Sequence, residues 1–117
     1  MGKDNVIKIK SYEFALSILK LAKTMKVDFV TNVLIKQLIR SGTSIGANVE
    51  EAIAGVSKKD FIHKMSISHK EARESNYWLR LLKDSDSLEV KIADDLITQS
   101  EELIKILFVI IRNSRAN

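Results

Sequence analysis

Apolar residues recur every three or four positions along most of the chain, which is the spacing of one face of an α-helix. The first run begins after Ser11 and the second after Asp28, and both residue types favour the N-terminal cap of a helix. We expect residues 1–10 to form a short extended arm before the first helix, and the second helix to continue to about Ile53. The predicted inward stripes are Phe14, Ala15, Ile18, Leu21, Ala22 and Met25 in the first helix, and Val30, Leu34, Leu38, Ile45, Val49 and Ala52 in the second.

Two longer helical runs follow. Ser57, with Asp60 three residues later, resembles a capping box and predicts a third helix that continues to about Lys83. Asp86 and Glu89 have the same spacing ahead of a fourth helix. The predicted seams are Phe61, Met65, Ser68, Ala72, Ser75, Leu79 and Leu82 in the third helix, and Ile92, Leu96, Gln99, Leu103, Ile106 and Ile110 in the fourth.

Four helices joined by short turns predict an all-α fold, an antiparallel up-down-up-down four-helix bundle. The 117 residues are enough for a single domain spanning 1–117. Residues 103–111 are apolar almost all round the fourth helix, which predicts a subunit interface as well as a core. Lys105 interrupts this run, and the run is shorter than the roughly 20 residues of a membrane span, so no membrane segment is expected.

The second predicted helix contains two glycines, Gly42 and Gly46, each of which costs about 1 kcal/mol relative to alanine. Because they lie four residues apart, they form one smooth face that a neighbouring helix or another subunit can approach closely.

Polar residues also occupy positions that should face inward. Their two interpretations are a hydrogen-bonded network that fixes the register between helices, which we favour, and a cleft that contacts a ligand. These residues are Gln37, Ser41, Ser44, Asn48, Ser68, Asn76 and Gln99.

The residues needed for catalysis or metal binding are sparse. The chain has no cysteine, which excludes disulfides and thiolate sites. His63 and His69 lie six positions apart, about 240° around a helix, so they cannot share one metal ion. Four glutamates lack a paired nucleophile and are expected to form salt bridges with Arg40, Arg73 or Lys70. We therefore expect neither an enzyme nor a cofactor. The glutamates are Glu50, Glu51, Glu71 and Glu74.

The net charge is +4, and the basic surplus lies in the first half of the sequence. Such a surplus can bind phosphate groups or can simply keep the surface soluble. Tyr77 and Trp78 are either interface anchors or platforms for base stacking, and their leucine neighbours favour the first interpretation. The candidate phosphate-binding residues are Lys20, Lys23, Lys36, Arg40, Lys58 and Lys59.

Residues 38–52 read LIRSGTSIGANVEEA, residues 57–62 read SKKDFI, and EA at 71–72 precedes YWL at 77–79. These segments resemble the 23S rRNA-intervening sequence protein family, also called four-helix bundle proteins. Ala52 departs from the glycine that many members have there, and the charge of +4 is modest. The residues that carry the family motif or its helix packing are Arg40, Gly42, Ser44, Gly46, Asn48 and Glu51.

The resemblance implies a bacterial, cytoplasmic protein that forms a homopentameric ring and has no established enzymatic activity. The family is similar to the accessory variability determinant proteins of diversity-generating retroelements, which are basic pentamers that bind nucleic acid and a reverse transcriptase. Two functions follow as expectations. The first is a homo-oligomeric bundle that binds RNA or DNA through the backbone, as an accessory to a reverse transcriptase or another nucleic-acid enzyme. The second is a protein-protein interaction scaffold with no nucleic-acid role.

Overall fold

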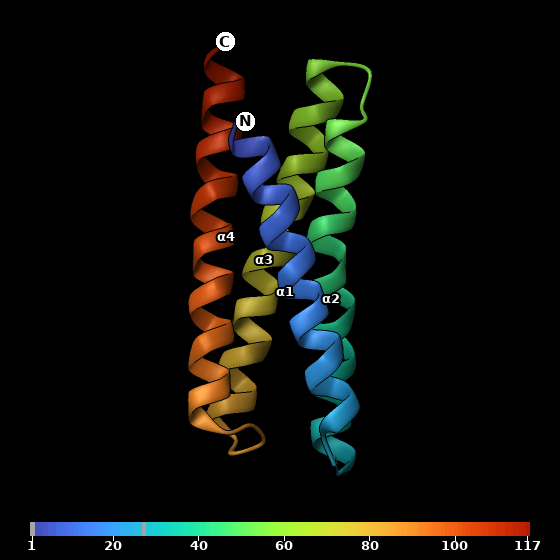
Figure 1. Cartoon of the computed structure of the whole chain (residues 1–117), viewed down its shortest axis with the longest axis vertical. Helices are drawn as coiled ribbons and strands as arrows, with labels where there is room; N and C mark the ends of the chain where they lie inside the picture. Colours follow the sequence, from blue (N-terminus) through green and yellow to red (C-terminus); the bar gives the residue numbers. More distant parts are fainter. Residues whose placement is uncertain (1, 27) are drawn as a thin grey trace.

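The computed structural model describes residues 2–26 and 28–117, with the backbone alone for Lys3 and Asp4. Its four helices are α1 (Lys3–Thr24), α2 (Phe29–Ile53), α3 (Lys58–Asp84) and α4 (Val90–Ala116), drawn in Figure 1. The bundle is elongated, with extents of 47 × 20 × 20 Å. The predicted all-α four-helix bundle is therefore confirmed.

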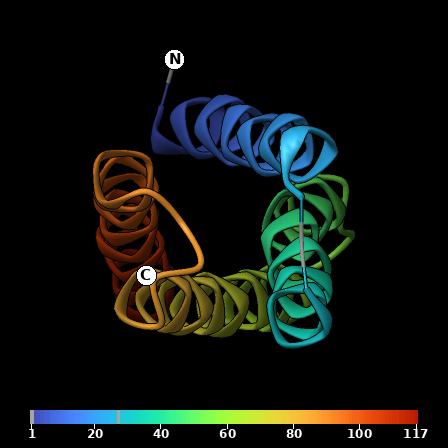
Figure 2. The same ribbon diagram turned by 90° about the horizontal axis from the view of Figure 1, so that it is seen from below.

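The helices occupy the corners of a square when the bundle is viewed along its axis (Figure 2). α1 and α3 each pack against both α2 and α4, and within the described residues the backbones of the two diagonal pairs lie farther apart. The connections between successive helices lie at alternating ends of the bundle (Figure 1). Each helix thus shares two long grooves with its neighbours.

The predicted caps of α2 and α3 are confirmed. The backbone N–H of Thr31 donates to Oδ1 of Asp28 at 2.8 Å, and the N–H of Asp60 donates to Oγ of Ser57 at 3.0 Å. These two side chains satisfy N–H groups that have no partner within the first turn of a helix. The bond from the backbone of Thr31 also lowers the pKa of the Asp28 carboxyl from its ordinary value of 3.8.

The predicted cap at Asp86 is wrong. Asp86 has a φ of 59° and ends α3 instead of starting α4. The N–H of Ser87 donates to the carbonyl of Leu82 at 2.9 Å, and that of Asp86 donates to the carbonyl of Lys83 at 3.1 Å. This pair of bonds is the Schellman arrangement, in which a left-handed residue satisfies the last carbonyls of a helix. α4 then begins after Glu89, whose side chain makes no cap bond.

The predicted extended arm is also wrong, because α1 begins at Lys3 and residues 3–10 are helical. Met1 lies outside the described residues. Ile7 is completely buried and lies one turn before Ser11 on the same face, so the inward stripe starts earlier than expected. Ser11 is consequently an interior residue of α1, and its hydroxyl donates to the carbonyl of Lys8 at 3.2 Å.

Two of the predicted stripes are displaced by one residue over part of their length. In α2, Thr31 and Ile35 are buried where Val30 and Leu34 were expected, and Val30 is exposed.

In α4, the inward stripe is likewise displaced by one residue, and two of the three displaced positions hold small residues, which let the neighbouring helices approach closely. The expected seam residues Ile92, Gln99 and Ile106 are replaced in the interior by Ala93, Ser100 and Leu107.

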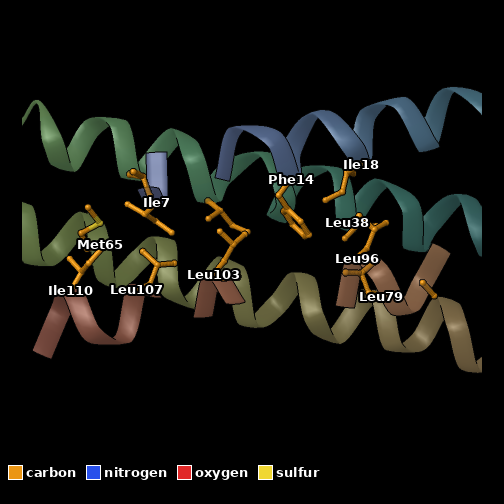
Figure 3. Packing of buried hydrophobic residues seen from close by; sticks show 14 of the residues in the cluster. Ile7, Phe14, Ile18, Leu38, Met65, Leu79, Leu96, Leu103, Leu107 and Ile110 are labelled. Carbon is orange, nitrogen blue, oxygen red and sulfur yellow. The ribbon is translucent and has the colours of Figure 1, made fainter. Parts of the chain in front are cut away.

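The hydrophobic core runs the length of the bundle and draws on all four helices (Figure 3). No helix in the described part of the chain is both long enough and apolar enough to cross a membrane. The labelled core residues are Ile7, Phe14 and Ile18 of α1, Leu38 of α2, Met65 and Leu79 of α3, and Leu96, Leu103, Leu107 and Ile110 of α4.

Candidate functional site

The glycine face of α2 packs against α1, as the sequence predicted for a close neighbour. A Cβ atom placed on Gly46 would lie 3.2 Å from Oγ of Ser11, and one placed on Gly42 would overlap the side chain of Ile18. The two glycines thus serve contact within the subunit.

Buried serines connect α2 to α3. The hydroxyl of Ser75 donates to Oγ of Ser41 at 2.8 Å, and that of Ser68 donates to the carbonyl of Ile45 at 2.8 Å. All three serines are completely buried. Among the described residues, no buried side-chain polar atom lacks a hydrogen-bond partner. Of the inward polar residues expected from the sequence, Ser41 and Ser68 are therefore hydrogen-bonded between α2 and α3, and their role in fixing the register of the helices stays a prediction.

The outer part of the α2–α3 contact is ionic. Nη1 of Arg40 lies 3.1 Å from Oε2 of Glu71, and Nη2 contacts Oε1 of Glu74. Glu74 Oε1 also accepts a hydrogen bond from Nε1 of Trp78 at 3.3 Å. Farther along, Nζ of Lys64 pairs with Oε1 of Glu51 at 3.2 Å. The charge of Arg40, a predicted phosphate ligand, is therefore neutralised by two carboxylates.

The remaining motif residues bond within α2. Oγ of Ser44 donates to the carbonyl of Arg40 at 2.6 Å, and Nδ2 of Asn48 donates to the carbonyl of Ser44 at 2.8 Å. The polar motif residues thus bond within α2 and, through Arg40 and Glu51, to α3, whereas the two motif glycines face α1.

The structure does not bring the other predicted basic residues together. Lys20 and Lys23 lie near the end of α1, whereas Lys58 and Lys59 open α3 at the opposite end of the bundle (Figure 1). Lys36 lies in α2. Nζ of Lys58 donates to the backbone carbonyl of Asn117. These lysines are exposed, and the pair on α1 lies far from the pair on α3, so their role in phosphate binding stays a prediction.

Tyr77 and Trp78 have different surroundings. Their ring centroids lie 5.1 Å apart at an interplanar angle of 68°. Trp78 is half-buried against the core, while Tyr77 is 47% exposed beside the guanidinium of Arg80. Only Tyr77 presents a largely accessible ring, and both predicted roles stay open for it.

A mixed-charge hollow lies between α1 and α4. Leu16 and Leu103 line it together with polar residues of both helices. Nζ of Lys10 and Oε1 of Glu102 form an ion pair across it at 3.0 Å. Cation and carboxylate neutralise each other here, so this hollow offers no surplus charge to a ligand.

The α3–α4 groove is the surface that the sequence interpretation missed. Three adjoining hollows lie along it. The first and second hollows both include His69 and Phe108, and the second and third both include Arg73 and Ile104. A signal was present in the sequence, because cations and aromatics alternate at helical spacing on each helix. These residues are Arg73, Tyr77 and Arg80 of α3, and Lys105, Phe108, Arg112 and Arg115 of α4.

The charge of the α3–α4 groove is positive. No ion pair involves Arg73, Arg80, Lys105, Arg112 or Arg115 within residues 2–26 and 28–117.

His69 lies in the groove as a neutral group. Burial, with the nearby charge of Arg73 as the second cause, lowers the pKa of the His69 imidazole below 6.5. The described residues contain no cluster of three His, Cys, Asp or Glu side chains that could hold a metal ion.

Comparison with known proteins places the chain among its relatives. A crystal structure of a protein of unknown function from the S23 ribosomal protein family of Bacteroides thetaiotaomicron VPI-5482 is 43% identical to it. That match covers 95% of this chain and 99% of the other, with a TM-score of 0.85. No curated protein matches the sequence. The profile of the 23S rRNA-intervening sequence proteins matches residues 3–109, and the chain therefore belongs to the 23S rRNA-intervening sequence protein family.

Proposed function

We propose that this protein is a non-enzymatic, homo-oligomeric accessory protein that binds RNA or DNA through the phosphate backbone in the bacterial cytoplasm. The chain has a net charge of +4. The observation that carries the proposal is a set of exposed cationic side chains that form no ion pair in the part of the chain that the structure describes, namely Arg73, Arg80, Lys105, Arg112 and Arg115. Cations that are not neutralised within the fold remain available to phosphate groups.

We further propose that the antiparallel up-down-up-down bundle assembles into a homopentameric ring. An outward row of apolar side chains on α1 supports self-association, because such a row is favourable only when another surface covers it. Five copies would bring the charge to about +20, which increases the attraction of a nucleic acid. The row consists of Val6, Ile9, Tyr12, Leu16 and Leu19, which are 37–59% exposed.

The partner of such an assembly would be a larger nucleic-acid enzyme, with a reverse transcriptase as the first candidate. The resemblance to retroelement accessory proteins supports this choice. The alternative function is a protein-protein interaction scaffold with no nucleic-acid role. If no nucleic acid binds, the exposed apolar row on α1 would favour this alternative, because an apolar surface suits contact with another protein.

The test is fluorescence anisotropy of labelled structured RNA, single-stranded DNA and duplex DNA, titrated with protein freed of nucleic acid. We expect binding at low salt that weakens steeply as salt rises, because each phosphate contact releases counterions. The slope of the logarithm of the binding constant against the logarithm of the salt concentration gives the number of phosphate contacts. A lack of binding to all three probes at low salt would overturn the proposal and favour the scaffold.

A further inference from the structure

The α3–α4 groove combines positive charge with accessible aromatic rings. Phe108 of α4 is 54% exposed and Tyr77 of α3 is 47% exposed. The guanidinium carbon of Arg112 lies 5.9 Å from the centre of the Phe108 ring, and that of Arg80 lies 5.7 Å from the centre of the Tyr77 ring. Each ring is thus paired with a cation at the surface, and each guanidinium adds a second flat surface for stacking.

The groove is also continuous and apolar at its base. Ile104 and Val109 line it, and Ile104 belongs both to the hollow beside Phe108 and to the hollow beside Tyr77. The three overlapping hollows extend along α3 from Ser66 to Arg80. Fourteen helical steps correspond to about 21 Å. A flexible strand of a few nucleotides fits this length.

We propose that the α3–α4 groove is a binding site for single-stranded nucleic acid. The phosphates contact Arg73, Lys105 and Arg112, and the bases stack on Phe108 and Tyr77. This inference rests on the proposed function and adds the surface and the strandedness of the ligand. It replaces the dispersed lysines of α1, α2 and α3 as the principal contact.

The chemistry favours a single strand over the other anionic macromolecules. A duplex presents phosphates but keeps its bases stacked inside, so exposed rings would contribute little to binding it. An acidic peptide supplies carboxylates but has no flat groups to stack on Phe108. Alternating phosphates and free bases match the alternation of cations and aromatic rings in the groove.

The first experiment compares two charge-matched variants. The groove variant carries Arg73→Gln, Lys105→Gln, Arg112→Gln and Arg115→Gln. The control variant carries Lys20→Gln, Lys23→Gln, Lys36→Gln and Lys59→Gln, which are exposed positions outside the groove. Each loses four positive charges, so a difference between them reports position and not net charge.

The probes are oligouridylate and oligodeoxythymidylate of about 12 nucleotides, a length within the usual site sizes. We expect the groove variant to reduce the slope of the salt dependence by about 2, since three of its changed residues contact phosphates and each lost contact to a single strand contributes about 0.7. The control variant should retain most of the affinity. The two probes separate RNA from DNA.

The second experiment tests stacking with Phe108→Leu against Phe29→Leu, a matched change at another exposed phenylalanine, 82% accessible in the first turn of α2. We expect Phe108→Leu to weaken single-strand binding about tenfold while the salt slope stays unchanged. Duplex binding should change little in either variant.

The outcomes separate this inference from the proposed function. If the unmodified protein binds no nucleic acid, both fail. If it binds but the control variant loses as much affinity as the groove variant, the function stands and the groove assignment is overturned. A lower oligomeric mass for the groove variant than for the unmodified protein would show that the groove makes subunit contacts. That result would also overturn the assignment of the groove as a nucleic-acid site. Equal displacement of the probe by polyglutamate would indicate an acidic-protein site instead.

Discussion

At the scale of single residues, Gly46 carries the clearest packing constraint. A side chain at this position meets Ser11 of α1, and even a Cβ would lie 3.2 Å from the hydroxyl oxygen. Gly46 is only partly buried. It matters because α1 packs closely against its backbone, and not because it buries apolar surface. A residue without a side chain thus determines the distance between α1 and α2.

Gly46→Leu should destabilise the bundle by about 1–3 kcal/mol, because the added atoms force α1 away from α2. Urea denaturation gives the free energy of unfolding. The control is Ala47→Leu, an exposed neighbour on the same helix. Equal stability of the two variants would contradict the close-approach explanation.

Asp28 gives a pH-dependent prediction. Its pKa in the folded protein lies below the ordinary value of 3.8, chiefly because of the bond from the backbone of Thr31. The stabilisation is therefore fully present above about 3.8 and is lost as the pH falls through the folded-state pKa. Asp28→Ala should melt at a lower temperature than the unmodified protein at pH 7, and the difference should shrink in acid.

Thermal denaturation monitored by circular dichroism at a series of pH values measures this difference. Asp28→Asn is the control, because asparagine caps a helix without a charge. A difference between Asp28→Ala and the unmodified protein that persists unchanged below the folded-state pKa would rule out the ionised carboxylate as its source.

At the scale of helices, an exposed cation of α2 links α2 to α3 through ion pairs. Arg40 is half exposed, but its guanidinium pairs with Glu71, whose side chain is 10% exposed, and with Glu74. The buried serines lie on the inner side of the same contact. Polar bonds therefore link these two helices, while apolar packing supplies the bulk of the burial.

Arg40→Met should cost about 2 kcal/mol, because it leaves the carboxylate of Glu71 nearly buried without its cation. The matched control is Lys64→Met, which removes a cation from the exposed carboxylate of Glu51 and should cost less than about 1 kcal/mol. Denaturant unfolding compares the two. Equal costs would show that the Arg40 cluster behaves as an ordinary surface pair.

At the scale of the whole molecule, apolar side chains remain exposed on the outside of the bundle. The outward row on α1 shares its helix with the inward stripe of Ile7, Phe14 and Ile18, so α1 is apolar on two faces. The sequence placed the expected interface on α4, where Phe108 is exposed. The proposed assembly through α1 would leave Phe108 and the α3–α4 groove free for a ligand.

Light scattering after gel filtration should give a mass about five times the 13.2 kDa of one chain. Leu16→Glu, on the outward row of α1, should lower this mass while the helical content stays unchanged, because it places a charge in an apolar contact. Lys20→Glu on the same helix is the control for the added negative charge. A monomeric mass for the unmodified protein would contradict the ring.

The local predictions from the sequence succeed at two helix starts and fail at two others, because α1 extends back to Lys3 beyond Ser11 and Asp86 ends α3. Asp28 and Ser57 begin their helices as expected, because a cap and the turn that it satisfies are neighbours in the chain. The predictions of the inward stripe fail where either of two adjacent faces of one helix could point to the core, as at Gln99 and Ser100 in α4. Helical spacing permits either face, and only the fit against α3 selects Ser100, which accepts a bond from Asn76 at 3.0 Å.

The sequence by itself determined four helices, most of their boundaries, the smooth face at Gly42 and Gly46, and the family. These features depend on residues close together in the chain or on a motif within α2. The tertiary structure alone decided that Arg40 is neutralised by α3, and that cations and aromatic rings of α3 and α4 form one groove. The physical reason is that helical periodicity places side chains on a face, whereas the neighbour of that face depends on how all four helices pack together.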